Sequence, residues 1–318
     1  MKKVLVFSQL DAEILARLQQ QYHVVQIDPK QGDVNQQILA QVADADGMIG
    51  AGRPLNANNL HTAQQLKVIS SVSVGYDNYD LDYLHQQGIQ LCHTPHVLTE
   101  TTADLAFTLL LSAARQVAHL DAWTKAGQWQ RTVAAKQFGQ DVFGKTLGIV
   151  GLGHIGAAIA RRGFYGFNMN ILYHNRRPKP ELAQSLNAVY CELNVLLQRA
   201  DFVVLAVDLN HDSQALIGAT ELAFMQKHAV LVNIARGAVV DEHALVTALQ
   251  QRQIFAAGLD VYQHEPLTHS ELFALDNVVT LPHIGSATQE TRKKMAELAY
   301  QNLVDALEGR TARYCVAT

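Results

Sequence analysis

The stretch Leu147-Gly-Ile-Val-Gly151-Leu-Gly153-His154-Ile155-Gly156 decides the fold class, because it joins an apolar strand to a helix through three glycines. In this setting Gly151 permits a tight turn, Gly153 lets the backbone approach a pyrophosphate, and Gly156 lets the helix pack on the strand. The N–H groups at the start of the helix then face the phosphates. The pattern predicts a dinucleotide-binding turn; an ordinary glycine-rich strand–helix loop is the alternative.

Short apolar runs alternate with helical patterns on both sides of this turn. The expected strands cover residues 4–7, 24–27, 47–49, 67–70, 89–92, 147–150, 170–173, 202–206, 230–233, 256–259 and 278–280. Such alternation is typical of parallel sheets with helices on both faces. We expect an α/β protein with two parallel-sheet domains, Rossmann-like and flavodoxin-like, and a cleft between them. The predicted substrate domain is residues 1–98 plus 288–318, and the predicted dinucleotide-binding domain is residues 99–287.

One long helix is expected from Thr99 to about Lys125. Its apolar side chains nearly encircle it, and a helix that is apolar all round is buried all round. We therefore expect it to lie between domains, between subunits, or both, and we predict a homodimer. Residues 127–144 are predicted to form a connecting arm; the role of Trp129 in this arm stays open.

Composition narrows the class of protein. The 318 residues are 48% hydrophobic and 17% charged, which excludes a disordered chain. The formal net charge of −4 argues against nucleic-acid and anionic-membrane partners. The apolar run near residues 103–114 contains Asp104 and is too short to span a bilayer. The three cysteines, Cys92, Cys191 and Cys315, form no CxxC pair and are predicted to be buried structural thiols of a soluble cytoplasmic protein.

The end of the second strand after the glycine-rich turn bears on which dinucleotide binds. A site for NAD usually carries an acid about 20 residues after the glycines, where it binds the ribose hydroxyls. Here the segment reads Tyr173-His-Asn-Arg-Arg-Pro-Lys179, with Arg176 and Arg177 at that point. Two arginines favour a 2′-phosphate, so we predict NADPH as the preferred cofactor, with NADH possible. A solvated basic loop is the alternative, and the nearby Asp208 would repel a phosphate.

Three further polar segments each follow a predicted strand, and they contain Arg236, Glu265 and His283. Carboxyl ends of parallel strands gather along one crevice, so these side chains are expected to meet there. An arginine can hold the carboxylate of a 2-oxo acid, and a histidine can give a proton to its carbonyl as a hydride arrives. A carboxylate beside the histidine favours the imidazolium. A metal site at His264 and His269 is disfavoured, because Pro266 prevents the helix that would align them, and we predict no metal.

Six segments in order resemble the D-isomer-specific 2-hydroxyacid dehydrogenase family over nearly the whole chain, most closely its glyoxylate/hydroxypyruvate and 2-ketogluconate reductases. They are Ser73-Val-Gly-Tyr-Asp-Asn, Thr99-Glu-Thr-Thr-Ala-Asp-Leu-Ala, Gly151-Leu-Gly-His-Ile-Gly, Asn233-Ile-Ala-Arg-Gly, Gly258-Leu-Asp-Val and Pro282-His-Ile-Gly-Ser. His154 departs from the arginine that the family often carries there. The family also contains dinucleotide-sensing co-repressors, so a regulatory protein of the same fold is the alternative function.

The resemblance implies reduction of a small 2-oxo acid, namely glyoxylate, hydroxypyruvate or 2-ketogluconate, to the D-2-hydroxy acid. It implies a catalytic trio of Arg236, Glu265 and His283. The predicted substrate-binding residues are Val74 and Gly75, through their backbone N–H groups, with Arg236, His283 and Ser286. The predicted cofactor-binding residues are Thr102, Gly151, Gly153, His154, Ile155, Gly156, Asn175, Arg176, Arg177, Ala235, Asp260 and Gly285. The preferred 2-oxo acid and the role of Arg53 stay open.

Overall fold

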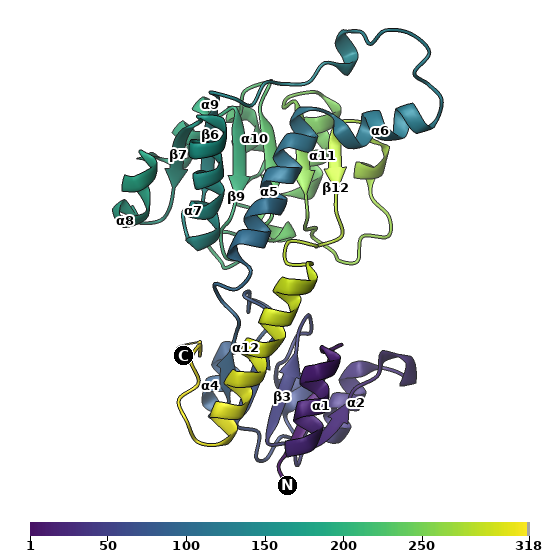
Figure 1. Cartoon of the computed structure of the whole chain (residues 1–318), viewed down its shortest axis with the longest axis vertical. Helices are drawn as coiled ribbons and strands as arrows, with labels where there is room; N and C mark the ends of the chain where they lie inside the picture. Colours follow the sequence, from purple (N-terminus) through teal and green to yellow (C-terminus); the bar gives the residue numbers. More distant parts are fainter. Residues whose placement is uncertain (317–318) are drawn as a thin grey trace. The chain divides into compact units, whose positions relative to one another are not determined.

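The computed structural model describes residues 1–316, which divide into two compact units. Unit 1 comprises Met1–Leu98 with the segment from Ala287 onward, and unit 2 comprises Thr99–Ser286. The boundary expected after residue 287 lies one residue from the observed one, since Ala287 belongs to the turn that leads into the last helix. Each unit is built on one parallel sheet (Figure 1).

Unit 1 has a five-stranded sheet in the order β2-β1-β3-β4-β5, which is the flavodoxin-like order. Its strands are β1 (Lys3–Val6), β2 (His23–Gln26), β3 (Gly47–Gly50), β4 (Val68–Ser71) and β5 (Gln90–Cys92). Its helices are α1 (Ala12–Gln21), α2 (Val34–Gln41), α3 (Ala57–Leu60), α4 (Leu81–Gln86) and α12 (Gln289–Leu307). Helices α1 and α12 cover one face of the sheet, and α2, α3 and α4 cover the other.

Helix α12 is the last helix of the chain, yet it packs against the first sheet. Leu303 is fully buried there. The Ser70 hydroxyl on β4 donates to the Ala299 carbonyl at 2.7 Å, and the Asn302 side chain donates to the His93 carbonyl at 3.0 Å. Apolar burial and two polar contacts therefore fix α12 on the sheet.

Unit 2 has a seven-stranded parallel sheet in the order β12-β11-β10-β9-β6-β7-β8, the Rossmann order extended by one strand. Its strands are β6 (Thr146–Val150), β7 (Asn170–His174), β8 (Val189–Tyr190), β9 (Phe202–Leu205), β10 (Val230–Asn233), β11 (Ala256–Leu259) and β12 (Val278–Thr280). Its α-helices are α5 (Thr99–Ala114), α6 (Val117–Lys125), α7 (His154–Arg161), α8 (Pro180–Ala183), α9 (Leu193–Arg199), α10 (Ala219–Phe224) and α11 (Glu242–Gln250). Helices α5 and α7 cover one face, and α9, α10 and α11 cover the other. The short β8 and α8 have too few apolar residues to be detected in the sequence.

The predicted single helix from Thr99 to Lys125 is wrong, because the chain forms two helices that meet at Gln116. Gln116 has a left-handed backbone (φ 54°), which ends a right-handed helix. The arm contacts the chain at this break: the Gln140 N–H donates to the Ala114 carbonyl at 2.8 Å, and the Gln116 side chain donates to the Phe138 carbonyl at 2.8 Å. Within one chain, Asp104 and Thr108 form an exposed strip on α5 and every residue of α6 is at least partly exposed, so the expected cover by a second subunit stays a prediction.

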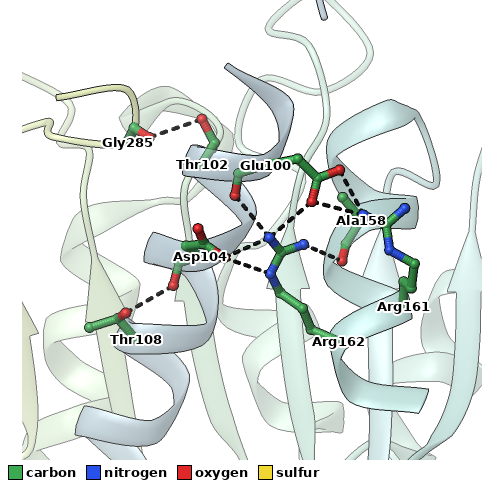
Figure 2. Close-up of polar contacts among 8 residues, drawn as sticks. All are labelled: Glu100, Thr102, Asp104, Thr108, Ala158, Arg161, Arg162 and Gly285. Carbon is green, nitrogen blue, oxygen red and sulfur yellow. Dashed lines mark hydrogen bonds and ion pairs between the residues drawn. The ribbon is translucent and has the colours of Figure 1, made fainter. Parts of the chain in front are cut away.

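The helix that follows the glycine-rich turn is tied to α5 by ion pairs (Figure 2). Arg161 binds Glu100 at 2.7 Å, and Arg162 binds Asp104 at 2.6 Å. The hydrogen bond from Arg161 outweighs the effect of burial and lowers the pKa of Glu100. These exposed pairs each contribute little to stability alone, but together they fix the rotation of α7 against α5.

Among residues 1–316, the structure contains no helix that is both long enough and apolar enough to cross a membrane.

Truncating Leu303 to alanine should lower the free energy of unfolding by about 2–5 kcal/mol, because it leaves a cavity between α12 and the sheet of unit 1. Urea unfolding followed by circular dichroism would measure the change. Lys294→Ala, on an exposed position of the same helix, is the control and should change stability by less than about 0.5 kcal/mol. Equal stability of the two variants would contradict this account of α12.

Candidate active site

The three predicted catalytic residues lie in loops that leave neighbouring strands of unit 2. Arg236 follows β10, Glu265 follows β11 and His283 follows β12. These strands are adjacent and parallel, so their carboxyl ends lie at the same edge of the sheet. The topology therefore brings together three segments that are far apart in the sequence.

Glu265 and His283 are in direct contact. The His283 Nδ1 lies 2.7 Å from Glu265 Oε2, and the other carboxylate oxygen accepts the Tyr262 N–H at 3.0 Å. The His283 side chain is 48% exposed and that of Glu265 33% exposed. The contact therefore fixes the ring at Nδ1 while the imidazole stays accessible.

The charge state of Glu265 follows from its neighbours. Burial by itself would raise the pKa of this carboxyl group. The hydrogen bond and charge of His283, the Tyr262 N–H and the charge of Arg236 oppose that effect and leave the pKa below its ordinary value. Glu265 is therefore ionised at neutral pH, in direct contact with His283.

A buried carboxylate supports the loop that carries His283. Asp260 is 1% exposed, and its two oxygens accept the Ile284 N–H at 2.7 Å and the Gly285 N–H at 2.8 Å. On the other side of the loop, the Thr102 hydroxyl on α5 donates to the Gly285 carbonyl at 3.1 Å (Figure 2). The loop is thereby fixed directly after His283, whose own backbone is left-handed (φ 54°).

Asp260, Thr102 and Gly285 thus stabilise the His283 loop, a role that the sequence did not predict. Burial raises the pKa of Asp260, and the two loop N–H groups oppose that rise by stabilising the carboxylate. Their predicted contacts with the cofactor stay predictions.

The Arg236 loop is fixed by its own side chains and by its neighbour. Asn233, at the end of β10, accepts the Ala235 N–H at 3.0 Å and donates to the Arg236 carbonyl at 2.9 Å. A Cβ atom on Gly237 would lie 1.8 Å from the Tyr262 carbonyl carbon, so only glycine allows the two loops to touch. Tyr262 in turn donates its hydroxyl proton to the Leu281 carbonyl at 2.9 Å, next to the His283 loop.

Sequence reasoning did not single out Tyr262 or Gly237. The Arg-Gly pair and the tyrosine two residues after Asp260 were visible, but only the packing of the loops gives them a role.

A cavity of about 790 Å³ lies beside the glycine-rich turn, at the carboxyl ends of β6, β7 and β9. Gly151 (φ +102°) makes the turn, and a Cβ on Gly156 would lie 2.1 Å from the Gly151 carbonyl oxygen. The space next to Gly153 is open, and α7 begins at His154 with Ile155 and Gly156 in its first turn. This geometry fits the pyrophosphate of a dinucleotide at the start of a helix.

Charged residues of both signs line this cavity. Arg176, Arg177 and Lys179 come from the loop after β7, and Asp208 and Asp212 come from the loop after β9. Arg176 pairs with Asp212 at 3.1 Å, with both side chains largely exposed. Asp212 is an acidic neighbour that the sequence analysis did not identify.

Asn175 also lines the cavity, but its amide is engaged by the turn itself. Its side-chain oxygen accepts the Leu152 N–H at 2.6 Å and its nitrogen donates to the Leu152 carbonyl at 3.4 Å. The side chain thus closes the glycine-rich turn. Its direct contact with a cofactor stays a prediction.

The remaining predicted residues lie in loops. Val74 and Gly75 follow β4 in unit 1 and are partly exposed. Within residues 1–316 neither of their N–H groups donates to a protein acceptor, and the Val74 carbonyl lies 3.0 Å from the His93 Nδ1. Ser286 is the last residue of unit 2 and is partly exposed. Their predicted role in substrate binding is compatible with these positions and stays a prediction.

The chain is similar to known proteins over nearly its whole length. Residues 107–285 match the model of the D-isomer specific 2-hydroxyacid dehydrogenase, NAD binding domain. The chain is 45% identical over 314 residues to glyoxylate/hydroxypyruvate reductase B of Klebsiella pneumoniae subsp. pneumoniae, covering 98% of this chain and 97% of the relative. It is 46% identical, with the same coverage, to the Escherichia coli K12 protein of that name.

Solved structures of similar proteins match this chain over nearly its whole length. A protein from Thermus thermophilus is 40% identical with a TM-score of 0.88, covering 99% of this chain and 100% of that chain. An NADPH-dependent glyoxylate/hydroxypyruvate reductase from Sinorhizobium meliloti, in complex with NADP and malonate, is 33% identical with a TM-score of 0.88, covering 99% and 97%. None of these relatives is named as a regulator. The chain belongs to the D-isomer specific 2-hydroxyacid dehydrogenase family.

Proposed function

We propose that this protein reduces glyoxylate or hydroxypyruvate to the D-2-hydroxy acid, with NADPH as the preferred cofactor. The observation that carries the proposal is the 2.7 Å contact of His283 with Glu265 at the same sheet edge as a dinucleotide-sized cavity. The names of the relatives support glyoxylate and hydroxypyruvate as substrates, whereas 2-ketogluconate rests on the sequence resemblance alone. The cytoplasm is the proposed compartment.

The chemistry divides between the cofactor and the side chains. A bound reduced nicotinamide supplies the hydride, which no amino-acid side chain can provide. His283, with Nδ1 held by Glu265, gives the proton on Nε2 to the carbonyl oxygen of the substrate. Arg236 holds the substrate carboxylate by paired hydrogen bonds.

Glu265 acts through His283. Because its pKa is lowered, it stays ionised as the pH falls below the ordinary range of a glutamate. An ionised Glu265 holds the His283 ring through Nδ1 and so keeps the acid in position for reduction. Reduction should therefore continue into mildly acidic solution, where Glu265 is still ionised.

A substrate panel tests the proposal directly. Glyoxylate, hydroxypyruvate and 2-ketogluconate, each offered with NADPH and with NADH, should show turnover as loss of reduced-nicotinamide absorbance. If none of the six pairs of substrate and cofactor showed turnover, the result would contradict the proposed activity and favour a dinucleotide-sensing regulatory protein.

Replacing His283 by alanine should lower kcat by about 10²–10⁴, the usual contribution of a positioned acid–base group. Glu265→Gln should retain more activity than His283→Ala, because the acid–base group remains and only the carboxylate that holds its ring is lost. His264→Ala, an exposed neighbour of Glu265, is the control and should leave kcat and the pH profile unchanged. A near-normal kcat for His283→Ala at neutral pH would refute the assignment.

The preference for NADPH rests on the charges that line the cavity. Arg176, Arg177 and Lys179 can form charge-assisted hydrogen bonds with a 2′-phosphate, whereas Asp208 and Asp212 oppose it. The pair of Arg176 with Asp212 is exposed and therefore weak, so a phosphate can replace the carboxylate. The balance favours the phosphate, because the cations outnumber the acids and Arg176 and Arg177 lie together.

The wild-type protein should prefer NADPH over NADH by roughly 10- to 150-fold in kcat/KM, which corresponds to about 1.5–3 kcal/mol. The double variant Arg176→Ala with Arg177→Ala should lose most of this preference through a higher KM for NADPH. Asp212→Asn should increase it, because a competing carboxylate is removed. Equal kcat/KM for both cofactors in the wild type at low salt would show that the arginines only form a solvated loop.

The arm between α6 and β6 supports the proposal of a homodimer. Trp129, Phe138 and Phe143 are 62%, 60% and 69% exposed, and they lie within 15 residues of one another in the sequence. Large exposed apolar side chains grouped in this way mark an interaction surface. A second copy of this chain is the proposed partner, and Val117 in the preceding helix α6, 52% exposed, would extend the surface.

Light scattering at micromolar concentration should return about twice the chain mass of 35.0 kDa. The variant Phe138→Ser with Phe143→Ser should shift the protein toward monomer, since it removes apolar area from the arm. Phe273→Ser, an exposed phenylalanine outside the arm, is the control and should leave the mass unchanged. A wild-type mass near that of one chain would reject the dimer.

A further inference from the structure

Two of the three cysteines lie side by side in unit 1. Cys92 is the last residue of β5, and Cys315 lies in the C-terminal segment that follows α12. Their Sγ atoms are 3.5 Å apart, although 223 residues separate them in the sequence. The third cysteine, Cys191, lies in unit 2.

The backbone around the pair has a defined register. The His93 N–H donates to the Tyr314 carbonyl at 3.1 Å, and the Val316 N–H donates to the Leu91 carbonyl at 2.8 Å. These bonds flank Cys92 and Cys315, so the two residues form a non-hydrogen-bonded antiparallel pair. Cα atoms in such a pair are about 4.5 Å apart, within the range that a disulfide spans. A disulfide can therefore form here without a rearrangement of the backbone.

The two thiols differ in environment. Cys92 is fully buried, and burial together with the adjacent Cys315 raises the pKa of its thiol. Cys315 is partly exposed, and the Gln90 side-chain amide donates to its sulfur at 2.8 Å. Because Cys315 is the more accessible of the two thiols, it is the first to react, and the buried Cys92 is the resolving thiol.

We propose that Cys92 and Cys315 are a dithiol site that low-molecular-weight disulfides of the oxidised-glutathione class convert to a disulfide. The Cys315 thiolate attacks one sulfur of the oxidant, forms a mixed disulfide and expels one glutathione thiolate. Cys92 then loses its proton and attacks Cys315 Sγ, which expels the second glutathione. The protein loses two electrons and two protons, and one oxidised glutathione becomes two reduced glutathiones.

Oxidation would fasten the C-terminal segment to the edge of the unit 1 sheet. In the dithiol form, the two backbone hydrogen bonds and the packing around Cys315 hold that segment on β5. A covalent link across so long a stretch of chain restricts the unfolded state strongly. The site also adjoins His93, whose ring contacts the Val74 carbonyl in the loop predicted to bind substrate.

The test uses the full-length protein incubated with oxidised glutathione at mildly alkaline pH. The number of titratable thiols should fall from three to one, and proteolysis followed by mass spectrometry should yield a peptide that joins Cys92 to Cys315. The unfolding temperature should rise by several degrees, and dithiothreitol should reverse both changes.

Matched variants separate this site from general thiol chemistry. Cys191→Ser should respond as the wild type does. Cys315→Ser should show neither the linked peptide nor the rise in unfolding temperature. It also keeps the buried Cys92 intact, so the test does not depend on a core substitution. Three free thiols after oxidation, glutathione retained on Cys315 without closure, or a linkage that involves Cys191 would each overturn the proposal.

Discussion

The buried Asp260 carboxylate is the contact on which the arrangement of the site depends. It accepts two successive N–H groups, of Ile284 and Gly285, directly after the left-handed His283. A non-glycine residue in that conformation persists only where its surroundings enforce it. Without the Asp260 carboxylate, two buried N–H groups would lack partners. The loop that carries His283 would then lose the contacts that fix its backbone. The position of His283, the predicted acid–base group, thus depends on Asp260, which directly follows the neighbouring strand β11.

The same logic extends across the carboxyl edge of the unit 2 sheet. Gly237 presses the Arg236 loop against Tyr262, and the Tyr262 N–H holds the Glu265 carboxylate. The tyrosine hydroxyl reaches the Leu281 carbonyl next to the His283 loop. The loop after β11 therefore contacts both the loop after β10 and the segment after β12. These contacts hold the polar side chains that follow three adjacent strands as one rigid set.

The cavity at the glycine-rich turn is organised by charge. The start of α7 and the basic loop after β7 attract phosphates, while two acids from the loop after β9 restrain the same region. Helix α7 is held in place by the ion pairs with α5 at its other end. The cavity is therefore lined by the glycine-rich turn and by side chains of both charges.

Local sequence determined the two parallel-sheet domains, the turn at Gly151–Gly156 and the strands that precede Arg236, Glu265 and His283, because period, glycine placement and strand ends are properties of short segments. It also predicted that Glu265 and His283 meet, since parallel strands share one edge. It did not predict that α5 stops at Ala114, because the arm residue Gln140 takes that carbonyl. Nor did it predict that Asp212 pairs with Arg176, or that Cys315 lies against Cys92. Those three features join residues that no local pattern connects, so only the folded chain decides them.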